Sequence, residues 1–155
     1  MFSELRRKDR RLDNELAMEL LRTSEYGVLS SIGENGYPYG VPLNHVLMGE
    51  NIYFHCAKKG LKLDNIKSND KVSYCVIGPT QLQPQEFATN YTSAIVFGKI
   101  IEVEAGEEKD RVLLKFINKF SPEYLKEGKA YIGRMKENTK VLKIVIEHIT
   151  GKARK

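Results

Sequence analysis

Residues 27–44 read Gly27-Val-Leu-Ser-Ser-Ile-Gly-Glu-Asn-Gly-Tyr-Pro-Tyr-Gly-Val-Pro-Leu-Asn44, and this stretch predicts a β-hairpin. The apolar runs over residues 27–32 and 37–47 are typical of strands, and the Asn35-Gly36 pair between them tolerates the positive φ of a tight turn. Pro38 and Pro42 have no N–H to donate. The second strand is therefore expected at a sheet edge, at a bulge or against a ligand.

The rest of the chain predicts more strands of the same kind, with helices between some of them. Further strands are expected over residues 52–56, 72–77, 92–104 and 141–149, and residues 78–90 are expected to form a long loop. Apolar residues at helical spacing predict helices over residues 13–22, 61–68 and 106–120, with one or two short helices over 122–137. No series of β-α-β units is visible, so the fold class expected is mainly β: a small, mostly antiparallel barrel of about six strands with peripheral helices.

Composition is that of an ordinary globular protein, with 41% hydrophobic and 29% charged residues among 155. This length predicts a single domain over residues 1–155, with a basic N-terminal arm (1–11) and a C-terminal tail (150–155). The net charge of +5 is concentrated at these ends, because residues 12–151 carry 17 basic and 18 acidic side chains. A nucleic-acid groove needs clustered basic charge inside the fold, so nucleic acid is not an expected partner.

No apolar run approaches the ~20 residues of a membrane span, and no signal peptide is recognised, so a cytoplasmic protein without membrane contact is expected. Cys56 and Cys75 are not in a Cys-x-x-Cys spacing, which is consistent with a reducing compartment. His45, His55 and His148 lack the spacing of metal ligands, so no metal site is expected.

Two segments carry the pattern of a binding site. Residues 53–62 predict a strand, a short loop and a helix entry, where backbone amides and Lys58, Lys59 and Lys62 would suit a phosphate. Solvated lysines at a helix entry are the alternative interpretation. Residues 37–44 predict a strand with unpaired backbone groups that suit the edge of a flat ligand, and a proline-protected edge strand is the alternative. His55 lies beside the expected phosphate loop and is either functional or a structural histidine, while Cys56 is expected to be a buried thiol.

Six motifs in register extend these two segments to almost the whole chain. They are Arg6-Arg-Lys-Asp-Arg10, Tyr26-Gly-Val-Leu29, residues 36–44, residues 53–62, Tyr91-Thr-Ser93 with Phe97-Gly98, and Ile149-Thr-Gly-Lys152. Together they resemble the Nim-type (nitroimidazole-resistance) branch of the pyridoxamine 5′-phosphate oxidase-like flavoproteins. The resemblance implies an FMN-binding split barrel that holds its cofactor at a homodimer interface.

Site residues follow from this resemblance by position. It implies that Val41, Pro42, Leu43 and Asn44 lie along the isoalloxazine ring. His55, Cys56 and Ala57 would flank the ribityl chain and the phosphate, which Leu61 and Lys62 would bind. Ser93 would reach the flavin from the second chain, and Gly151 and Lys152 would close the site.

The activity implied is that of an FMN-dependent oxidoreductase, which passes electrons from a reduced donor to a small organic acceptor such as a nitroaromatic compound. The flavin carries the chemistry, so no catalytic triad is needed, and His55 is the candidate catalytic side chain. The arginine- and histidine-bearing C-terminal motif of the true oxidases is not recognised, so pyridoxamine phosphate oxidation is not expected. Two alternatives stay open: a non-catalytic flavin- or haem-binding sensor or stress protein, with His45 or His55 as a haem ligand, and a deazaflavin-dependent reductase.

Overall fold

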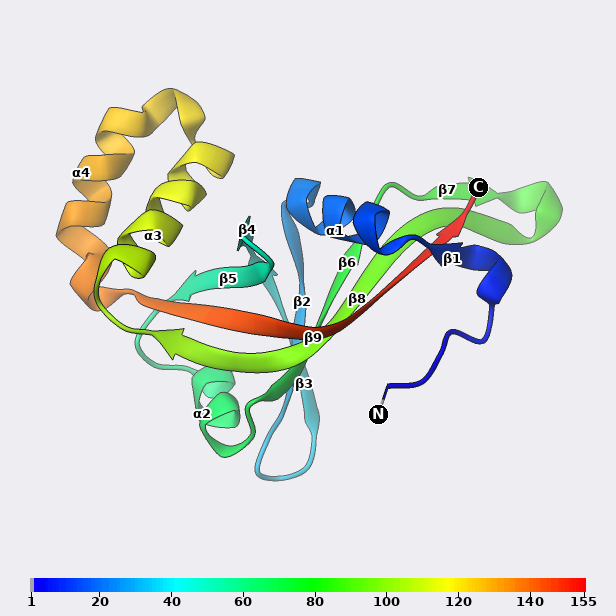
Figure 1. Cartoon of the computed structure of the whole chain (residues 1–155), viewed down its shortest axis with the longest axis horizontal. Coiled ribbons are helices and arrows are strands. Elements are labelled where there is room, and N and C mark those ends of the chain that lie inside the picture. The colour runs from blue at the N-terminus through cyan, green and yellow to red at the C-terminus, as the bar shows by residue number, and fades with distance from the viewer. Residues whose placement is uncertain (1) are drawn as a thin grey trace.

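A computed structural model describes residues 2–155, and its centre is one antiparallel nine-stranded sheet (Figure 1). Six strands are long: β2 (Tyr26–Ile32), β3 (Pro38–Asn44), β5 (Asn51–Cys56), β6 (Lys71–Ile77), β8 (Ala88–Val103) and β9 (Lys140–Arg154). Three are short: β1 (Arg11–Leu12), β4 (Val46–Met48) and β7 (Gln81–Gln83). The predicted fold class is confirmed, and the short strands account for the difference from the expected six.

The two ends of the sheet are neighbours in sequence. The strand order is β3-β2-β6-β8-β9-β5-β4, with β1 added to β9 and β7 added to β8. Only His45 separates the end of β3 from the start of β4. The sheet must therefore curve until its two end strands meet at His45, which makes it a split barrel, because β3 and β4 do not pair within residues 2–155. Both prolines of the hairpin lie in β3, an end strand, as their missing N–H groups predict.

Strands β8 and β9 are the longest and cross the whole molecule side by side (Figure 1). Their pairing runs from Tyr91 opposite Arg154 to Val103 opposite Val141. The sequence predicted a tail over residues 150–155, but β9 continues to Arg154 because β8 and β1 both pair with this segment.

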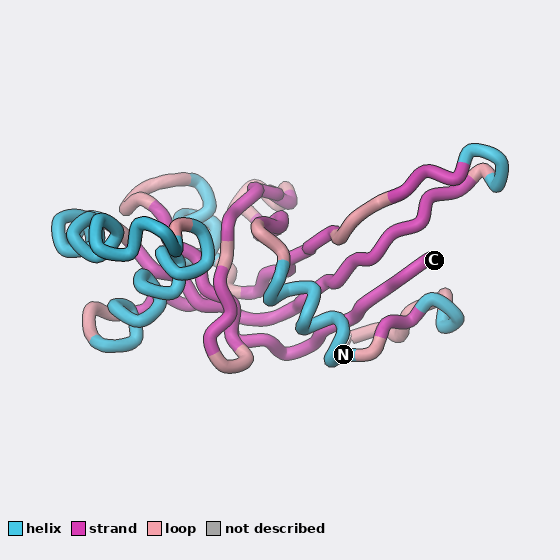
Figure 2. Tube along the Cα trace, turned by 90° about the horizontal axis from the view of Figure 1, so that it is seen from above, coloured by secondary structure: helices cyan, strands magenta, loops and turns pink. Residues whose placement is uncertain are grey.

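Residues 78–90 are not the structureless loop expected from their sequence. They contain β7 and the short helix η2 (Pro84–Glu86), and β7 pairs with the start of β8. The resulting hairpin projects from the body of the molecule in Figure 2. Arg154 holds it, since its guanidinium donates to Asn90 Oδ1 (2.5 Å) and Glu86 Oε2 (2.6 Å).

Helices cover the barrel at the positions that the apolar spacing predicts. They are α1 (Asn14–Thr23), α2 (Leu61–Ser68), α3 (Glu107–Phe120) and α4 (Leu125–Met135), and short turns of 3₁₀-helix lie at Lys8–Arg10 (η1), Pro122–Tyr124 (η3) and Lys136–Asn138 (η4). The first helix, α1, approaches β9 so closely that a Cβ on Gly151 would lie 3.0 Å from the Cβ of Ala17. Within residues 2–155, no helix is long and apolar enough to cross a bilayer.

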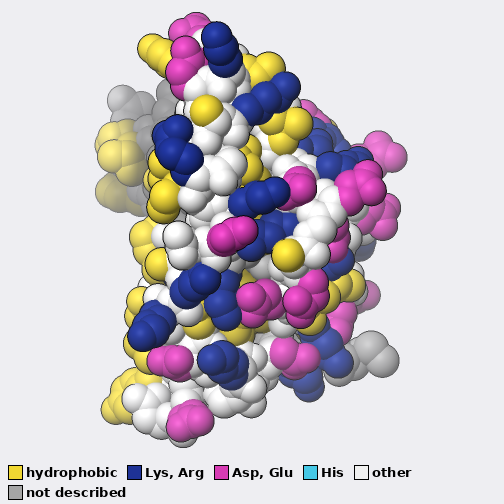
Figure 3. All heavy atoms as spheres, turned by 90° about the vertical axis from the view of Figure 1, so that its left-hand side faces the viewer, with side chains coloured by type: hydrophobic (Ala, Val, Ile, Leu, Met, Phe, Trp, Pro, Cys, Tyr) yellow, Lys and Arg dark blue, Asp and Glu magenta, His cyan; other side chains and the backbone are white. Residues whose placement is uncertain are grey.

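Two apolar clusters form the core. The larger fills the barrel and includes Leu29, Phe54, Tyr74 and Ile144, all fully buried. The smaller lies between the sheet and α3, where Phe116 packs near Tyr53 and Val141. The side of the molecule that carries α3 and α4 presents intermixed basic and acidic side chains to solvent (Figure 3).

Candidate functional site

The entry to α2 has the geometry of an anion site. Strand β5 ends at Cys56, a four-residue exposed loop follows, and α2 begins at Leu61. Gly60, at the N-cap, has φ 153° and has no side chain that could cap the helix. A helix start without a capping side chain leaves N–H groups of its first turn for an anion. Lys62 is half-buried at this point and supplies a cation, so the residues present fit a phosphate group.

Cys56 is buried just before this entry. Burial raises the pKa of its thiol, although the charges of Lys62 and Lys140 act in the opposite direction. The thiol therefore stays protonated near neutral pH, as expected of a structural cysteine rather than a nucleophile.

Strand β3 places its four predicted flavin residues alternately inward and outward. Val41 and Leu43 are half-buried and pack against the barrel core, whereas Pro42 and Asn44 are exposed. The Asn44 side chain donates to the Glu25 carbonyl oxygen at 3.0 Å. One edge of β3 pairs with β2 and no strand within residues 2–155 pairs with the other, so backbone groups on that edge can meet a ligand.

The predicted site residues of β3 form one group. Ser93 and Lys152 form a second, because they are direct partners in the β8–β9 ladder. Strands β2 and β6 lie between β3 and β8, which puts three strand spacings, about 14 Å, between the two groups. Within one chain, the structure therefore brings Ser93 to Lys152 but brings neither to β3.

His55 lies on the other side of β5 from Cys56. Its ring meets Phe116 of α3 edge-to-face, with 4.5 Å between centroids, and the residue remains exposed. Partial burial by this contact lowers the pKa of His55. The structure thus places the candidate catalytic histidine against α3, while the thiol of Cys56 points toward the barrel core.

An apolar surface connects the two groups of predicted site residues. We call it the outer face: side chains from β3, β2, β6 and β8 that project away from the barrel core, namely Tyr26, Val28, Ile32, Pro42, Ile77 and Ile95. Tyr26 is 62% exposed and Ile77 is 63% exposed. The strand register sets Pro42 opposite Val28, Val28 opposite Cys75, and Cys75 opposite Ile95, so the outer face is continuous across four strands. Contiguous exposed apolar surface of this kind marks an interaction site.

A buried polar network that the sequence did not reveal lies where the barrel closes. His45 is fully buried; its Nε2 lies 2.6 Å from the Leu21 carbonyl oxygen and its Nδ1 lies 2.7 Å from the Tyr74 hydroxyl. Lys119 of α3 donates to the carbonyl oxygens of Ser24 (2.6 Å) and His45 (2.9 Å). Both nitrogens of His45 are engaged and out of reach of solvent, so His45 does not suit the role of haem ligand.

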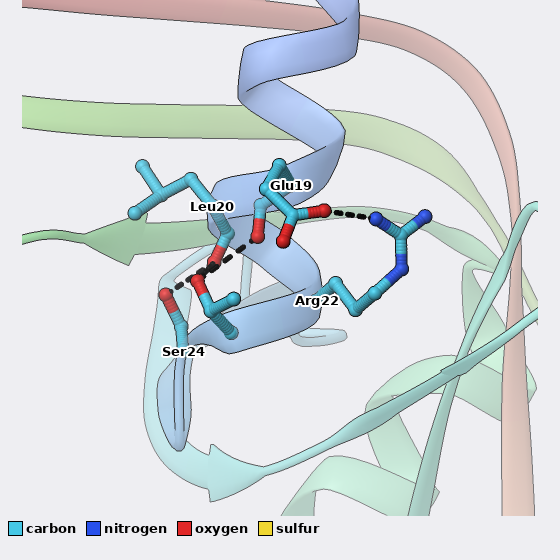
Figure 4. A network of polar contacts seen from close by, with 5 residues as sticks. Glu19, Leu20, Arg22 and Ser24 are labelled. Carbon is cyan, nitrogen blue, oxygen red and sulfur yellow. Dashed lines mark hydrogen bonds and ion pairs between the residues drawn. The ribbon is translucent and has the colours of Figure 1, made fainter.

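The end of α1 supplies two of the carbonyl groups in this network, and local contacts fix its position (Figure 4). The Ser24 hydroxyl donates to the Leu20 carbonyl oxygen at 2.6 Å, and Arg22 pairs with Glu19 on the outside of the helix. The sequence did hold one signal for Lys119: it follows Phe116 by three positions, which continues the buried stripe of α3.

Burial sets the protonation of these groups. It lowers the pKa of His45 to about 4, against the effect of the hydrogen bond to Leu21, and Lys119 lowers this pKa further. Burial likewise raises the pKa of Tyr74 and lowers that of Lys119. His45 is therefore neutral at physiological pH. No cluster of three or more metal-ligating side chains occurs within the described residues.

Comparison with known proteins identifies the family of this chain. The family model described as pyridoxamine 5′-phosphate oxidase matches residues 13–153. A search of curated proteins gave no significant match.

Solved structures share the fold at low sequence identity. A conserved hypothetical protein from Mycobacterium tuberculosis is 18% identical with a TM-score of 0.83, over 97% of this chain and 90% of that one. A candidate 5-nitroimidazole antibiotic resistance protein from Bacteroides thetaiotaomicron is 21% identical with a TM-score of 0.73, over 92% and 85%. An FAD- and haem-binding protein from Mycobacterium smegmatis is 16% identical with a TM-score of 0.76, over 94% and 74%.

Proposed function

The chain belongs to the pyridoxamine 5′-phosphate oxidase family, and from that premise we propose that it is a flavoprotein oxidoreductase. It holds FMN at the interface of a homodimer and passes electrons from a reduced donor to a small organic acceptor. When bound, the flavin supplies the hydride and electron transfer, so the protein has to bind, orient and shield it.

The observation that carries the proposal is the separation of the two groups of site residues. The α2 region and β3 form one group, because Asn65 of α2 donates to the hydroxyl of Ser31 in β2, the strand paired with β3. Ser93 and Lys152 form the other. The apolar outer face lies between them. A second copy of the chain packed on this face would set its own Ser93 and Lys152 near the first chain's β3, which completes a site that one chain leaves open.

Each part of the first group has a role that its chemistry supports. Lys62 and the free N–H groups at the start of α2 bind the phosphate, as a charge-assisted contact at a helix N-terminus. The open edge of β3 offers backbone donors and acceptors to the rim of the isoalloxazine ring, over residues 41–44. Protonated Cys56 forms part of the wall below the loop.

The acceptor is proposed from likeness alone. One similar structure is described as a candidate nitroimidazole resistance protein, and its likeness to this chain motivates a nitroaromatic acceptor. Another is described as binding FAD and haem, so FAD is the cofactor that competes most directly with FMN in this proposal.

Cofactor identity and turnover test the proposal together. The chain is purified with the cofactor it retains; released cofactor is identified by mass, and stoichiometry per chain by absorbance. We expect FMN, about one per chain, with the flavin band near ~450 nm and no intense band near ~410 nm from haem. We also expect NAD(P)H-dependent reduction of a nitroimidazole. A protein that binds no flavin when FMN is added would overturn the proposal. FAD or a deazaflavin in the mass spectrum would overturn the assignment of FMN as the cofactor. Bound flavin without turnover would show a flavin-binding protein and overturn the proposed oxidoreductase activity.

A further inference from the structure

A cavity of about 310 Å³ lies between the N-terminal arm and the second half of β9. Arm residues Leu5, Lys8 and Arg11 form one wall, and His148, Thr150 and Gly151 form the other. We call it the arm cavity. Of the residues assigned above to the flavin, it includes only Gly151, so it is separate from the phosphate entry at α2. Its volume is at the lower end of the range for small-molecule sites.

His148 gives the arm cavity a wall made of an aromatic ring. Its Nε2 is the one side-chain nitrogen or oxygen within residues 2–155 that is buried and has no hydrogen-bond partner. The ring is fixed in place, because it stacks on Phe2 at 4.8 Å between centroids with a 3° interplanar angle and lies 6.4 Å from the Phe97 ring. The ring therefore bounds the cavity, while its buried Nε2 is out of reach of a ligand there.

The charge of the lining favours an anion. Lys8 is neutralised by Glu4, which also lines the cavity, with Nζ and Oε2 2.8 Å apart. Arg11 makes no ion pair with any of residues 2–155, which leaves one positive charge in excess. Lys152 is the strand partner of Arg11, so a second cation lies beside it.

We propose that the arm cavity binds a small organic carboxylate, with the guanidinium of Arg11 on the carboxylate. Arginine presents paired N–H groups that match the two oxygens of a carboxylate. Leu5, Leu12 and Ile149 supply apolar walls for the body of the ligand, which suits a single-ring acid. The proposal rests on the arm and β9 and does not require a bound flavin.

Benzoate tests the proposal, with benzamide as the uncharged analogue of the same shape. Each is titrated into the purified full-length chain at constant ionic strength, with backbone amide shifts as readout. We expect benzoate to shift the amides of Leu5, Thr150 and Gly151 and to bind at least tenfold more tightly than benzamide. Arg11→Gln should weaken benzoate binding at least tenfold.

Arg6→Gln is the matched control, because Arg6 is an exposed cation on the same arm that does not line the cavity. It should change benzoate affinity less than twofold. Equal affinity for benzoate and benzamide, or unchanged benzoate affinity in Arg11→Gln, would overturn the proposal. Flavin content is measured on the same samples, so a protein that lacks flavin but binds benzoate would count against the proposed function and not against this site.

Discussion

Nδ1 of His45 lies 2.7 Å from the hydroxyl oxygen of Tyr74, at the residue that joins the two ends of the sheet. A carbonyl oxygen only accepts, so the contact of Nε2 with Leu21 puts the ring proton on Nε2. Nδ1 then accepts from Tyr74, whose single proton is shared with the Leu43 carbonyl oxygen at 2.9 Å. Burial, which lowers the pKa of His45, keeps the ring in this neutral form.

Stability is expected to fall as pH drops from about 6.5 to about 4. The pKa of His45 is lowered to about 4 in the folded chain by burial, and in the unfolded chain it returns to its ordinary value. Between these values the unfolded chain binds more protons, so stability is complete above the unfolded pKa and is lost as pH falls, by at most about 1.4 kcal/mol per pH unit. Urea midpoints of wild type and His45→Gln measure this, and NMR titration of the His45 ring checks the pKa directly. The same pH dependence in both proteins would contradict it.

Lys119→Met should lower the free energy of unfolding by about 2–3 kcal/mol. The substitution keeps most of the side-chain volume but removes the charged donor from the Ser24 and His45 carbonyl oxygens, which are left at a part-buried site. Lys115→Met, an exposed lysine one turn earlier on α3, should change stability by less than about 0.5 kcal/mol. Equal effects of the two substitutions in urea titrations would show that Lys119 is an ordinary surface lysine.

Lys62→Ala should weaken FMN binding by about 1.5–3 kcal/mol, the scale of a charge-assisted hydrogen bond. Lys67→Ala is the control, because Lys67 is an exposed lysine in the last turn of the same helix. It should leave affinity within about 0.5 kcal/mol of wild type. Quenching of FMN fluorescence on titration with protein gives both affinities. If the two variants bind FMN alike, the phosphate lies elsewhere.

Ile77→Asp should separate the proposed dimer and reduce its flavin content. Ile77 is 63% exposed on the outer face and is the strand partner of Ser93, so a carboxylate there would be buried in the interface. We expect at least tenfold weaker association, or about 1.4 kcal/mol, by sedimentation. Leu16→Asp changes a comparably exposed residue on α1, at 53%, and should have no effect on association. A wild type that sediments as a monomer, or an Ile77→Asp variant that remains a dimer, would exclude the outer face as the interface.

Sequence patterns predicted the strands whose apolar residues alternate with polar ones and the helices whose apolar residues recur at helical spacing. The hairpin of β2 and β3 is confirmed because Asn35-Gly36 and the two prolines act locally. The range of α2 is confirmed residue by residue. The β7 hairpin was missed because both its faces are largely exposed, so its sequence has no apolar alternation. The end of β9 was missed because its buried residue, Gly151, has no side chain that could give an apolar pattern.

The candidate site was less predictable, for a physical reason. The strand-loop-helix pattern identified the entry to α2, since anion binding there depends on local backbone. The break at His45 depends instead on Tyr74, Leu21 and Lys119, which come from distant parts of the chain. Residues 37–47 therefore look like one strand in sequence and are two in the structure.

The seam at His45 also bears on how the chain folds. Strands β3 and β4 are joined by a single residue, so bringing their ends together there requires no loop closure. The paired positions of β8 and β9, in contrast, are about 40 to 60 residues apart in the chain, with α3 and α4 between the two strands. The slow step of folding is then expected to be the β8–β9 pairing, with the two helices as its connector. Substitutions that stabilise the α3–α4 pair by itself should accelerate folding more than they slow unfolding.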